Sequence, residues 1–397
     1  MMNEEDKQYY LEFTIDNPTE YVATLADLKY KGVSITWNEI SQLCAEKFHS
    51  VHSESYYRKN FTKEYVARIL SDEITSSDLK DSILELQKER VKLSDVLSQN
   101  RAYVRRLARE DTIKEIALEA AHIVKESLPL TFLNHVESPL NTEKEAILLL
   151  SDWHYGLIVD SYWNKYDVDI AEERIKFLLK EVIERCKREE ISRIHVLNLG
   201  DLIAGRIHLP IRLESRVDTL TQIMKVSEIL TEFLNELSNN ISKVEYYSCI
   251  DNHSRVEPDK TQSLDLESLC RITDWYIKNR LEDNKRVEIH NNPYSEDIIT
   301  LNVLDHKIIA VHGDKDKPSD AISKLSNFTR DTYDAVLMAH RHHFTADEEC
   351  GTLVLGNGSL MGTDSYAKSL RMHSKPSQTL LFSTKERVAD TIVRIVL

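Results

Sequence analysis

Glycine and proline are distributed very unevenly along this chain of 397 residues. Only Gly32 precedes residue 156, and neither residue type occurs between Gly32 and Pro129. Both residues interrupt helices, so a stretch this long without them predicts an all-helical N-terminal third. The other eight glycines all follow, which indicates a different architecture in the remainder.

A helix start is recognisable at residues 36–39. The run Thr36-Trp37-Asn38-Glu39 has the form of a capping box, in which threonine and glutamate each satisfy a backbone N–H of the other. Apolar residues then recur at helical spacing, at Ile40, Leu43, Cys44 and Phe48. We therefore expect a helix to begin at about Thr36.

A second helix is expected after the polar break at 49–53. It would carry Tyr56, Tyr57, Arg58, Lys59 and Phe61. Two short helices joined by a polar link predict a helix-turn-helix-like domain over residues 1–75, whose second helix presents Ser55, Tyr56, Arg58 and Lys59 to nucleic acid. A small helical domain with a solvated basic helix is an equal alternative.

Residues 76–130 carry a heptad pattern. The seam comprises Leu79, Ile83, Leu86, Arg90, Leu93, Leu97, Asn100, Val104 and Leu107. About four repeats favour a coiled coil, and polar residues in such a seam fix register or partner number. We expect a homo-oligomer through residues 79–107, the alternative being one long helix folded onto a neighbour. The seam ends in a group of arginines, for which a solvated face and a phosphate-contacting strip are the two alternatives. They are Arg101, Arg105, Arg106 and Arg109.

Beyond a linker at residues 131–144, short β-rich runs alternate with amphipathic helices over residues 145–397. The expected strands are 146–150, 194–199, 244–249, 298–304, 308–311, 335–338, 353–355 and 380–382, and the expected helices include 171–187, 213–237 and 264–280. This alternation is typical of a layered α/β domain.

Composition limits the classes of partner and compartment. The net charge is −15, so any polyanion must be bound locally rather than by bulk charge. The acidic start does not resemble a signal peptide, and no apolar run reaches the roughly 18 residues of a membrane helix. Five scattered cysteines form no CxxC pair. We expect a cytoplasmic protein that has reduced thiols and does not bind membranes.

Polar clusters follow five of the expected strands directly. They are Asp152-Trp153-His154, Gly200-Asp201, Asn252-His253, His312-Gly313 and His340-Arg341-His342. Strand ends are where layered α/β domains bind ligands, and residues two apart on extended chain point to the same side. Mixed carboxylate, imidazole and amide donors suit Mn²⁺, with Fe²⁺ or Zn²⁺ as alternatives. Two such ions, about 3.5–4 Å apart, would activate a water or hydroxide and hold phosphoryl oxygens during in-line displacement.

In these five blocks the chain resembles the calcineurin-like metallophosphoesterase superfamily, whose pattern runs D-x-H, G-D, G-N-H-[D/E], H, G-H-x-H. The resemblance covers residues 145–397 and implies a four-layer αββα sandwich. It implies one metal ion bound by Asp152, His154 and His342, a second bound by Asn252, His312 and His340, and Asp201 bridging both. It also implies that His253 contacts the substrate phosphate and protonates the leaving group, a role that an imidazole can fill near neutral pH.

Three residues depart from that pattern. Asp251 and Ala339 replace glycines, and Ser254 replaces the acidic residue that can orient the catalytic histidine. Outside the blocks, Arg206, His208 and Arg255 are candidate substrate-phosphate contacts, each with a structural surface role as the alternative.

The order of helix-turn-helix, helical spacer and phosphoesterase also resembles phage-encoded metallophosphoesterases, which are described as similar to DNA-repair exonucleases of the Mre11/SbcD type. The resemblance implies a DNA nuclease that uses a metal-bound hydroxide and whose N-terminal module positions nucleic acid, in the host cytoplasm if phage-encoded. One alternative is a phosphomonoesterase or small-nucleotide phosphodiesterase, because the same metal core serves those reactions. Another is a non-catalytic DNA-binding accessory subunit, although such subunits typically lose metal ligands.

Overall fold

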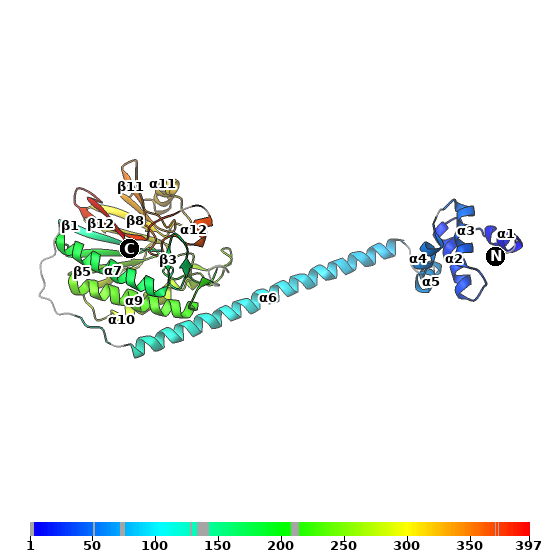
Figure 1. The fold of residues 1–397 in the computed structure, drawn as a ribbon, viewed down its shortest axis with the longest axis horizontal. Coiled ribbons are helices and arrows are strands. Elements are labelled where there is room, and N and C mark those ends of the chain that lie inside the picture. Colours follow the sequence, from blue (N-terminus) through cyan, green and yellow to red (C-terminus); the bar gives the residue numbers. More distant parts are fainter. Residues whose placement is uncertain are drawn as a thin grey trace. The chain divides into compact units, whose positions relative to one another are not determined.

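The computed structural model describes residues 4–50, 52–71, 76–127, 129–132, 143–207, 214–369, 371 and 373–397, with the side chains of 76–82, 365 and 366 left out. The chain forms two compact units, residues 1–107 and 108–397 (Figure 1). The long helix α6 contributes to both units.

The first unit begins with five short helices. They are α1 (Glu4–Leu11), α2 (Pro18–Tyr30), α3 (Trp37–Phe48), α4 (Glu54–Asn60) and α5 (Lys63–Leu70). The predicted capping box is confirmed, since Thr36 Oγ1 accepts from the Glu39 N–H at 3.2 Å and Glu39 Oε2 accepts from the Thr36 N–H at 2.9 Å. The core of this unit gathers apolar side chains of α2–α5, among them Tyr21, Leu25, Leu43, Tyr57 and Val66.

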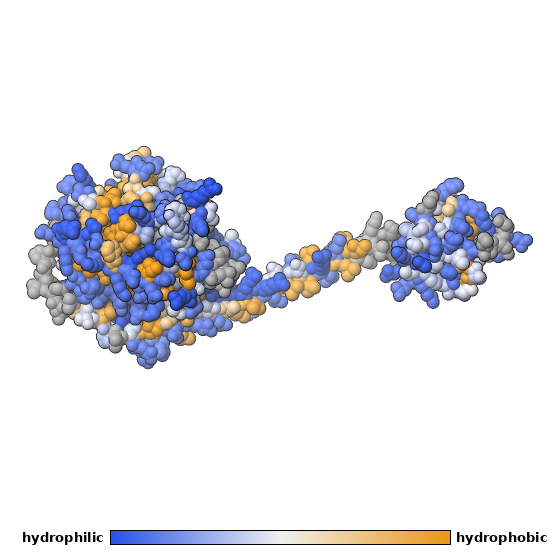
Figure 2. Space-filling view, viewed as in Figure 1, coloured by the Kyte–Doolittle hydropathy of each residue, from blue (hydrophilic) through white to orange (hydrophobic). Residues whose placement is uncertain are grey.

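Helix α6 runs from Ser76 to Glu126, which confirms the predicted long helix. Its apolar side chains up to residue 107 are exposed, for example Leu86 at 70%, Leu93 at 61% and Val104 at 62%. Figure 2 shows such hydrophobic residues along the rod of this helix. Near its C-terminal end, Ile116 belongs to the core of the second unit, and Ala120 is buried as well. Among the described residues, no helix is long and apolar enough to cross a membrane.

The second unit contains two large sheets. The first has the order β13-β12-β1-β4-β5-β6 and comprises β13 (Thr391–Val396), β12 (Ser377–Thr384), β1 (Lys144–Leu150), β4 (Arg193–Asn198), β5 (Lys243–Ser248) and β6 (Val287–Ile289). The second has the order β10-β11-β9-β8-β7 and comprises β10 (Thr345–Glu349), β11 (Thr352–Gly356), β9 (Ala335–Met338), β8 (His306–Val311) and β7 (Ile298–Val303). In the first sheet β1, β4, β5 and β6 are parallel to one another. In the second sheet β11, β9 and β8 are parallel to one another.

Helices cover the outer faces of both sheets, and this confirms the four-layer αββα sandwich. Helices α7 (Val168–Arg188), α9 (Thr219–Asn240) and α10 (Cys270–Arg280) pack on the first sheet through a cluster that includes Leu148 and Val196. The alternate residues Ile147 and Leu197 face the second sheet in a separate cluster. Helix α11 (Pro318–Thr329) packs on the far face of the second sheet.

All eight predicted strands are present, but two predicted helix starts are wrong. The helix expected from 213 begins at Thr219, because the Asp218 side chain caps it by accepting from the Thr221 N–H at 3.0 Å. The helix expected from 264 begins at Cys270, after a single 3₁₀ turn at Asp265–Glu267. The sequence analysis did not identify the hairpin of β2 (Val159–Asp160) and β3 (Lys165–Tyr166).

Candidate metal centre

The carboxyl ends of β1, β4 and β5 in the first sheet and of β8 and β9 in the second sheet carry the predicted ligands. Asp152 and His154 follow β1, Asp201 follows β4, Asn252 follows β5, His312 follows β8, and His340 and His342 follow β9. The loops are joined by their backbones, since the Asp152 N–H donates to Gly200 O and the His154 N–H to Asp201 O, each at 3.0 Å. The sheet thus fixes where these side chains meet.

A first ligand cluster consists of Asp152, His154, Asp201 and His342, whose nearest donor atoms all lie within 4.8 Å of one another. The Nε2 atoms of His154 and His342 are 3.1 Å apart, and His342 Nε2 lies 3.3 Å from Asp152 Oδ1. Both carboxylates are fully buried. This is the ligand set that the sequence predicts for one metal ion.

A second cluster consists of Asp201, His312 and His340. His312 Nε2 lies 3.1 Å from His340 Nδ1, 2.9 Å from Asn252 Oδ1 and 3.3 Å from Asp201 Oδ2. The other ring nitrogen of His312, Nδ1, donates to Leu199 O at 2.7 Å, which fixes the ring orientation. Asp201 therefore belongs to both clusters.

The donor set fits divalent cations. Among the described residues, both carboxylate oxygens of Asp152 and Oδ2 of Asp201 are buried without a hydrogen-bond partner, an unfavourable state that a cation would relieve. Burial would raise the pKa of Asp201, but the imidazoles of His253 and His312 hold it well below its usual range. Although burial disfavours the charged form of His312, the Asp201 carboxylate raises its pKa to about 10. Positive charge is therefore favoured at the bridging carboxylate.

Five of the seven predicted ligands adopt left-handed backbone conformations. The φ angles are 52° at Asp152, 45° at His154, 53° at Asp201, 67° at His340 and 59° at His342. Such φ values are uncommon for residues other than glycine, although Asn, Asp and His tolerate them better than most. Clustering of strained backbone is typical of functional sites.

His253 lies beside the first cluster, with Nε2 3.8 Å from Asp201 Oδ2 and its ring centroid 4.6 Å from that of His154. Its Nδ1 donates to the carbonyl oxygen of Ala204 at 2.7 Å. That carbonyl orients the ring, a role that the sequence analysis left open because Ser254 replaces an acidic residue. The sequence signal for this contact is Gly205 (φ 72°), where a Cβ atom would lie 2.2 Å from His253 O.

Asp251 explains how the loop accommodates the two replacements around Asn252. Its carboxylate accepts from the Ser254 N–H at 2.6 Å and from Ser254 Oγ at 2.9 Å, so the pair closes the turn that carries Asn252 and His253. Burial, together with the nearby charge of Asp201, raises the pKa of Asp251 to about 7. Gly200 is needed opposite, because a Cβ there would lie 2.4 Å from Asp251 Cβ.

The three residues predicted to contact substrate differ in burial and in hydrogen bonding. Arg255 donates through Nε to Asn252 O at 3.0 Å, and its Nη1 is buried without a hydrogen-bond partner among the described residues. Arg206 is half-buried on the loop after Asp201, and His208 lies outside the described residues. Trp153 and Tyr155, which flank His154, are buried.

The residues predicted to contact nucleic acid lie on helix α4 of the first unit. Tyr56 is 42% exposed and stacks on His52 with ring centroids 4.1 Å apart. Arg58 is exposed and lies 3.8 Å from Glu54, and Lys59 is exposed as well. Tyr57 instead points into the core and donates to Cys44 Sγ at 3.2 Å.

Arg109 does not belong to a phosphate-contacting strip or to a solvated face. Its guanidinium lies 3.3 Å from Glu257 Oε2 and 3.7 Å from Glu267 Oε2, and its side chain is only 15% exposed. It joins α6 to the segment 254–269 that follows His253. The remaining arginines of the strip, at positions 101, 105 and 106, are exposed.

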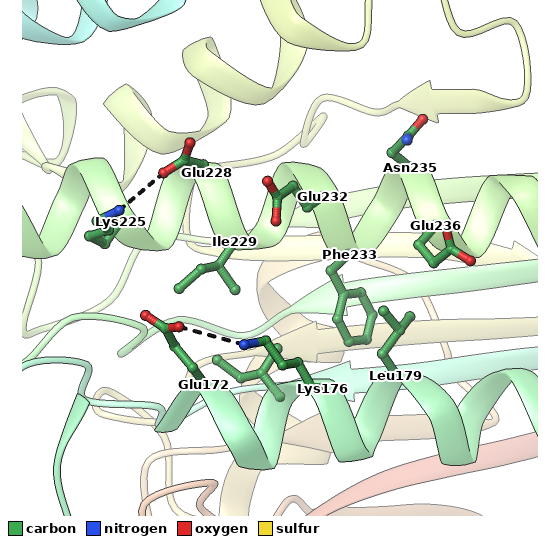
Figure 3. Close-up of a pocket in the computed structure, with 11 residues that line it drawn as sticks. Glu172, Lys176, Leu179, Lys225, Glu228, Ile229, Glu232, Phe233, Asn235 and Glu236 are labelled. Atoms are coloured by element: carbon green, nitrogen blue, oxygen red, sulfur yellow. Dashed lines mark hydrogen bonds and ion pairs between the residues drawn. The ribbon is translucent and has the colours of Figure 1, made fainter. Parts of the chain in front are cut away.

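A cavity of about 570 Å³ lies away from the ligand clusters, between α7 and α9 (Figure 3). Its charged lining is mainly acidic, with Glu172, Glu228, Glu232 and Glu236 against Lys176 and Lys225. Two of these acids form ion pairs, Lys225 with Glu228 at 3.4 Å and Lys176 with Glu172 at 3.8 Å. Such a lining disfavours the binding of anions.

The chain is 30% identical over 374 residues to the SPbeta prophage-derived uncharacterized protein YonJ of Bacillus subtilis, which covers 87% of this chain and 88% of the other. No protein-family model matches the chain. Similar solved structures include a novel archaeal phosphodiesterase (16% identity, 64% of this chain, 99% of that chain, TM-score 0.33) and Vacuolar Protein Sorting 29 of Cryptosporidium parvum (16%, 64%, 100%, TM-score 0.31). These identities and TM-scores are too low to support an inference about activity.

Proposed function

The chain belongs to the same family as the prophage-derived protein YonJ, whose name assigns no activity. From the ligand clusters we propose that the chain is a dinuclear metal-dependent phosphodiesterase, most specifically a DNA nuclease. The observation that carries the proposal is that the buried carboxylate of Asp201 is shared by two adjoining ligand clusters. A carboxylate between two cation sites is the arrangement that dinuclear phosphoryl transfer requires.

Seven side chains would hold the two ions. Asp152, His154 and His342 serve the first, Asn252, His312 and His340 serve the second, and Asp201 serves both. Ions bound there would neutralise charge on the phosphoryl oxygens and lower the pKa of a coordinated water. The proposed metal is Mn²⁺, with Fe²⁺ or Zn²⁺ as alternatives.

His253 is the proposed general acid. A carbonyl oxygen only accepts, so the contact with Ala204 O means that Nδ1 carries a hydrogen. The ring is then held with Nε2 on the side of Asp201. From this position Nε2 can deliver a proton to the oxygen that leaves phosphorus. Arg255 Nη1, buried and without a partner among the described residues, would donate to a phosphate oxygen.

The choice of DNA as substrate rests on the first unit and on the resemblance of the domain order to phage-encoded metallophosphoesterases. Helix α4 exposes Tyr56, Arg58 and Lys59, residue types that contact nucleic acid. The exposed apolar seam of α6 would pair two copies of the chain as a coiled coil. The proposed location is the cytoplasm, that of the host if the protein is phage-encoded.

The test is an assay of the purified chain with Mn²⁺ on 5′- and 3′-labelled single- and double-stranded DNA, beside an aryl phosphodiester and the Asp201→Asn variant. We expect the wild type to cleave DNA and Asp201→Asn to have lost that cleavage. The labels give the direction of cleavage. Ester hydrolysis without DNA cleavage would keep the dinuclear site and assign it a small-molecule or phosphoprotein substrate.

A further inference from the structure

Two aromatic side chains protrude from the turn of the β2–β3 hairpin. Tyr162 is 91% exposed and Trp163 is 55% exposed, with ring centroids 4.9 Å apart at an interplanar angle of 89°. Large aromatic rings bury apolar area when they have a partner, so exposure of two adjacent rings indicates a binding surface. Trp163 also lies 5.2 Å from the ring of His373, which follows α12 (Ser365–Ser369).

The turn beneath these rings is firmly anchored. Ser161 Oγ accepts from the N–H groups of Trp163 and Asn164 at 3.3 and 3.2 Å. The buried Asn164 amide donates to Met361 O at 2.8 Å and to Thr363 O at 3.0 Å, and Arg174 donates to Asn164 Oδ1 at 3.2 Å. The rings are therefore held outward by a fixed base, and a fixed base lowers the entropic cost of binding.

The aromatic turn belongs to the side of the centre that holds the first ligand cluster. Tyr166, at the end of the hairpin, donates to the carbonyl oxygen of Trp153, which lies between Asp152 and His154. On the other segment, Ser374 Oγ donates to His342 O at 2.6 Å, and Thr363 Oγ1 contacts His373 Nδ1 at 2.9 Å. In Figure 1, β3 and α12 lie on the same side of the domain.

The surroundings of the rings are basic although the chain is acidic overall. Exposed cations on or next to the two segments are Lys165, Lys368, Arg371 and Lys375. Two acidic residues lie on the same segments. Asp364 accepts a hydrogen bond from the Ala367 N–H at 2.7 Å, and Asp160 pairs with Lys165 across the hairpin. Exposed aromatic faces combined with cations are how proteins bind single-stranded nucleic acid, since bases stack on the rings while cations contact the backbone.

We propose that Tyr162 and Trp163 stack on unpaired bases next to the phosphate being cleaved, so that the substrate is single-stranded nucleic acid or an unpaired end. This inference rests on the proposed function, because it names the substrate class of the same centre. A duplex keeps its bases stacked inside, so it offers these rings no face except at frayed ends. The cations beside the rings would contact the phosphates that flank the stacked bases.

The test measures binding of a short fluorescent oligothymidylate by anisotropy in EDTA, where no hydrolysis occurs. The full chain carries Arg58→Ala and Lys59→Ala throughout, so that helix α4 does not mask the effect. Trp163→Ala is expected to weaken binding about 10-fold, the usual scale for one stacked base, and Trp163→Phe to retain most of it. Trp275→Ala, which removes a 42%-exposed tryptophan from α10, is the matched control and should bind as the parent does.

A further readout separates stacking from a structural role. An abasic oligonucleotide offers the rings no base, so it should bind the parent and Trp163→Ala equally. Equal oligothymidylate affinity of the parent and the Tyr162→Ala/Trp163→Ala double variant would overturn the inference. A wild-type chain that hydrolyses no phosphodiester would instead overturn the proposed function, because the binding measurement does not depend on turnover.

Discussion

The imidazole of His253 lies next to both ligand clusters but is a member of neither. His253→Ala should therefore leave metal content near that of the wild type while lowering turnover roughly 100-fold, the usual scale for a lost general acid. Metal analysis of the purified variant beside steady-state kinetics checks this. Asp201→Asn is the comparison, because loss of the shared carboxylate should reduce occupancy of both ions. If His253→Ala lost metal in proportion to activity, His253 would be a ligand.

A second residue-scale prediction concerns Asp274, which accepts from Ser248 Oγ at 2.8 Å and from Tyr246 Oη at 3.2 Å. Burial raises the pKa of Asp274 to about 6, against 3.8 in the unfolded chain. A carboxyl with a raised pKa contributes stability that is present below pH 3.8 and is lost as pH rises through about 6.

Asp274→Asn, which stays neutral and can keep both contacts, should raise the free energy of unfolding by about 1–2 kcal/mol at pH about 8. At pH about 4 the variant and wild type should be nearly equal. Urea unfolding at the two pH values measures the difference. A gain of equal size at both values would mean that ionisation of Asp274 is not its cause.

At the scale of elements, Arg109 links α6 to the segment 254–269. Arg109→Gln leaves Glu257 and Glu267 near each other without their partner, so we expect the segment to open more readily. Hydrogen exchange across 254–269 should accelerate, and stability should fall by about 1–3 kcal/mol. Arg105→Gln, an exposed arginine one turn earlier, is the control. Unchanged exchange in Arg109→Gln would mean that the ion pairs do not hold the segment.

The elements also show why some of the structure was predictable from sequence. Strands such as β1 and β9 are buried on both faces, so they appear as continuous apolar runs. Strand β10, Thr345–Glu349, has five exposed residues and exists because it pairs with β11, which its own sequence does not indicate. Helix starts were misplaced where a cap such as Asp218 was not recognised. The strand ends located the predicted ligands, whereas the contact between Ala204 O and His253 Nδ1 has only an indirect sequence signal, the glycine at position 205.

For the whole molecule, the exposed seam of α6 predicts self-association. Leu93 and Leu97 are 61% and 47% exposed, and Leu93→Asp/Leu97→Asp should put charges into the seam and convert an oligomer to monomers. Sedimentation velocity gives the mass. Leu118→Asp is the control, since Leu118 is 72% exposed on the same helix but lies beyond the heptad region. A wild-type monomer at micromolar concentration would contradict the coiled coil.

Because the chain forms two units, we expect the N-terminal helices to contribute to DNA binding and the two-sheet domain to contribute the hydrolysis. Deletion of residues 1–75 removes α1–α5 and leaves the cores of the two-sheet domain complete. We expect hydrolysis of an aryl phosphodiester to be retained and binding to long DNA to weaken. Kinetics and DNA binding on the same preparation measure both. Unchanged DNA affinity would make α1–α5 a folding or assembly module.

The left-handed backbone at five ligand positions has a consequence for how such a protein can evolve. Each costs folding free energy even for Asp and His, which tolerate this conformation better than most residues do. Glycine at any of the five would relieve that cost and abolish a ligand in one step. A lineage no longer selected for metal binding would therefore be driven by its own folding stability to lose the centre. Descendants that still carry Asp and His at all five positions should be those in which the chemistry is still in use.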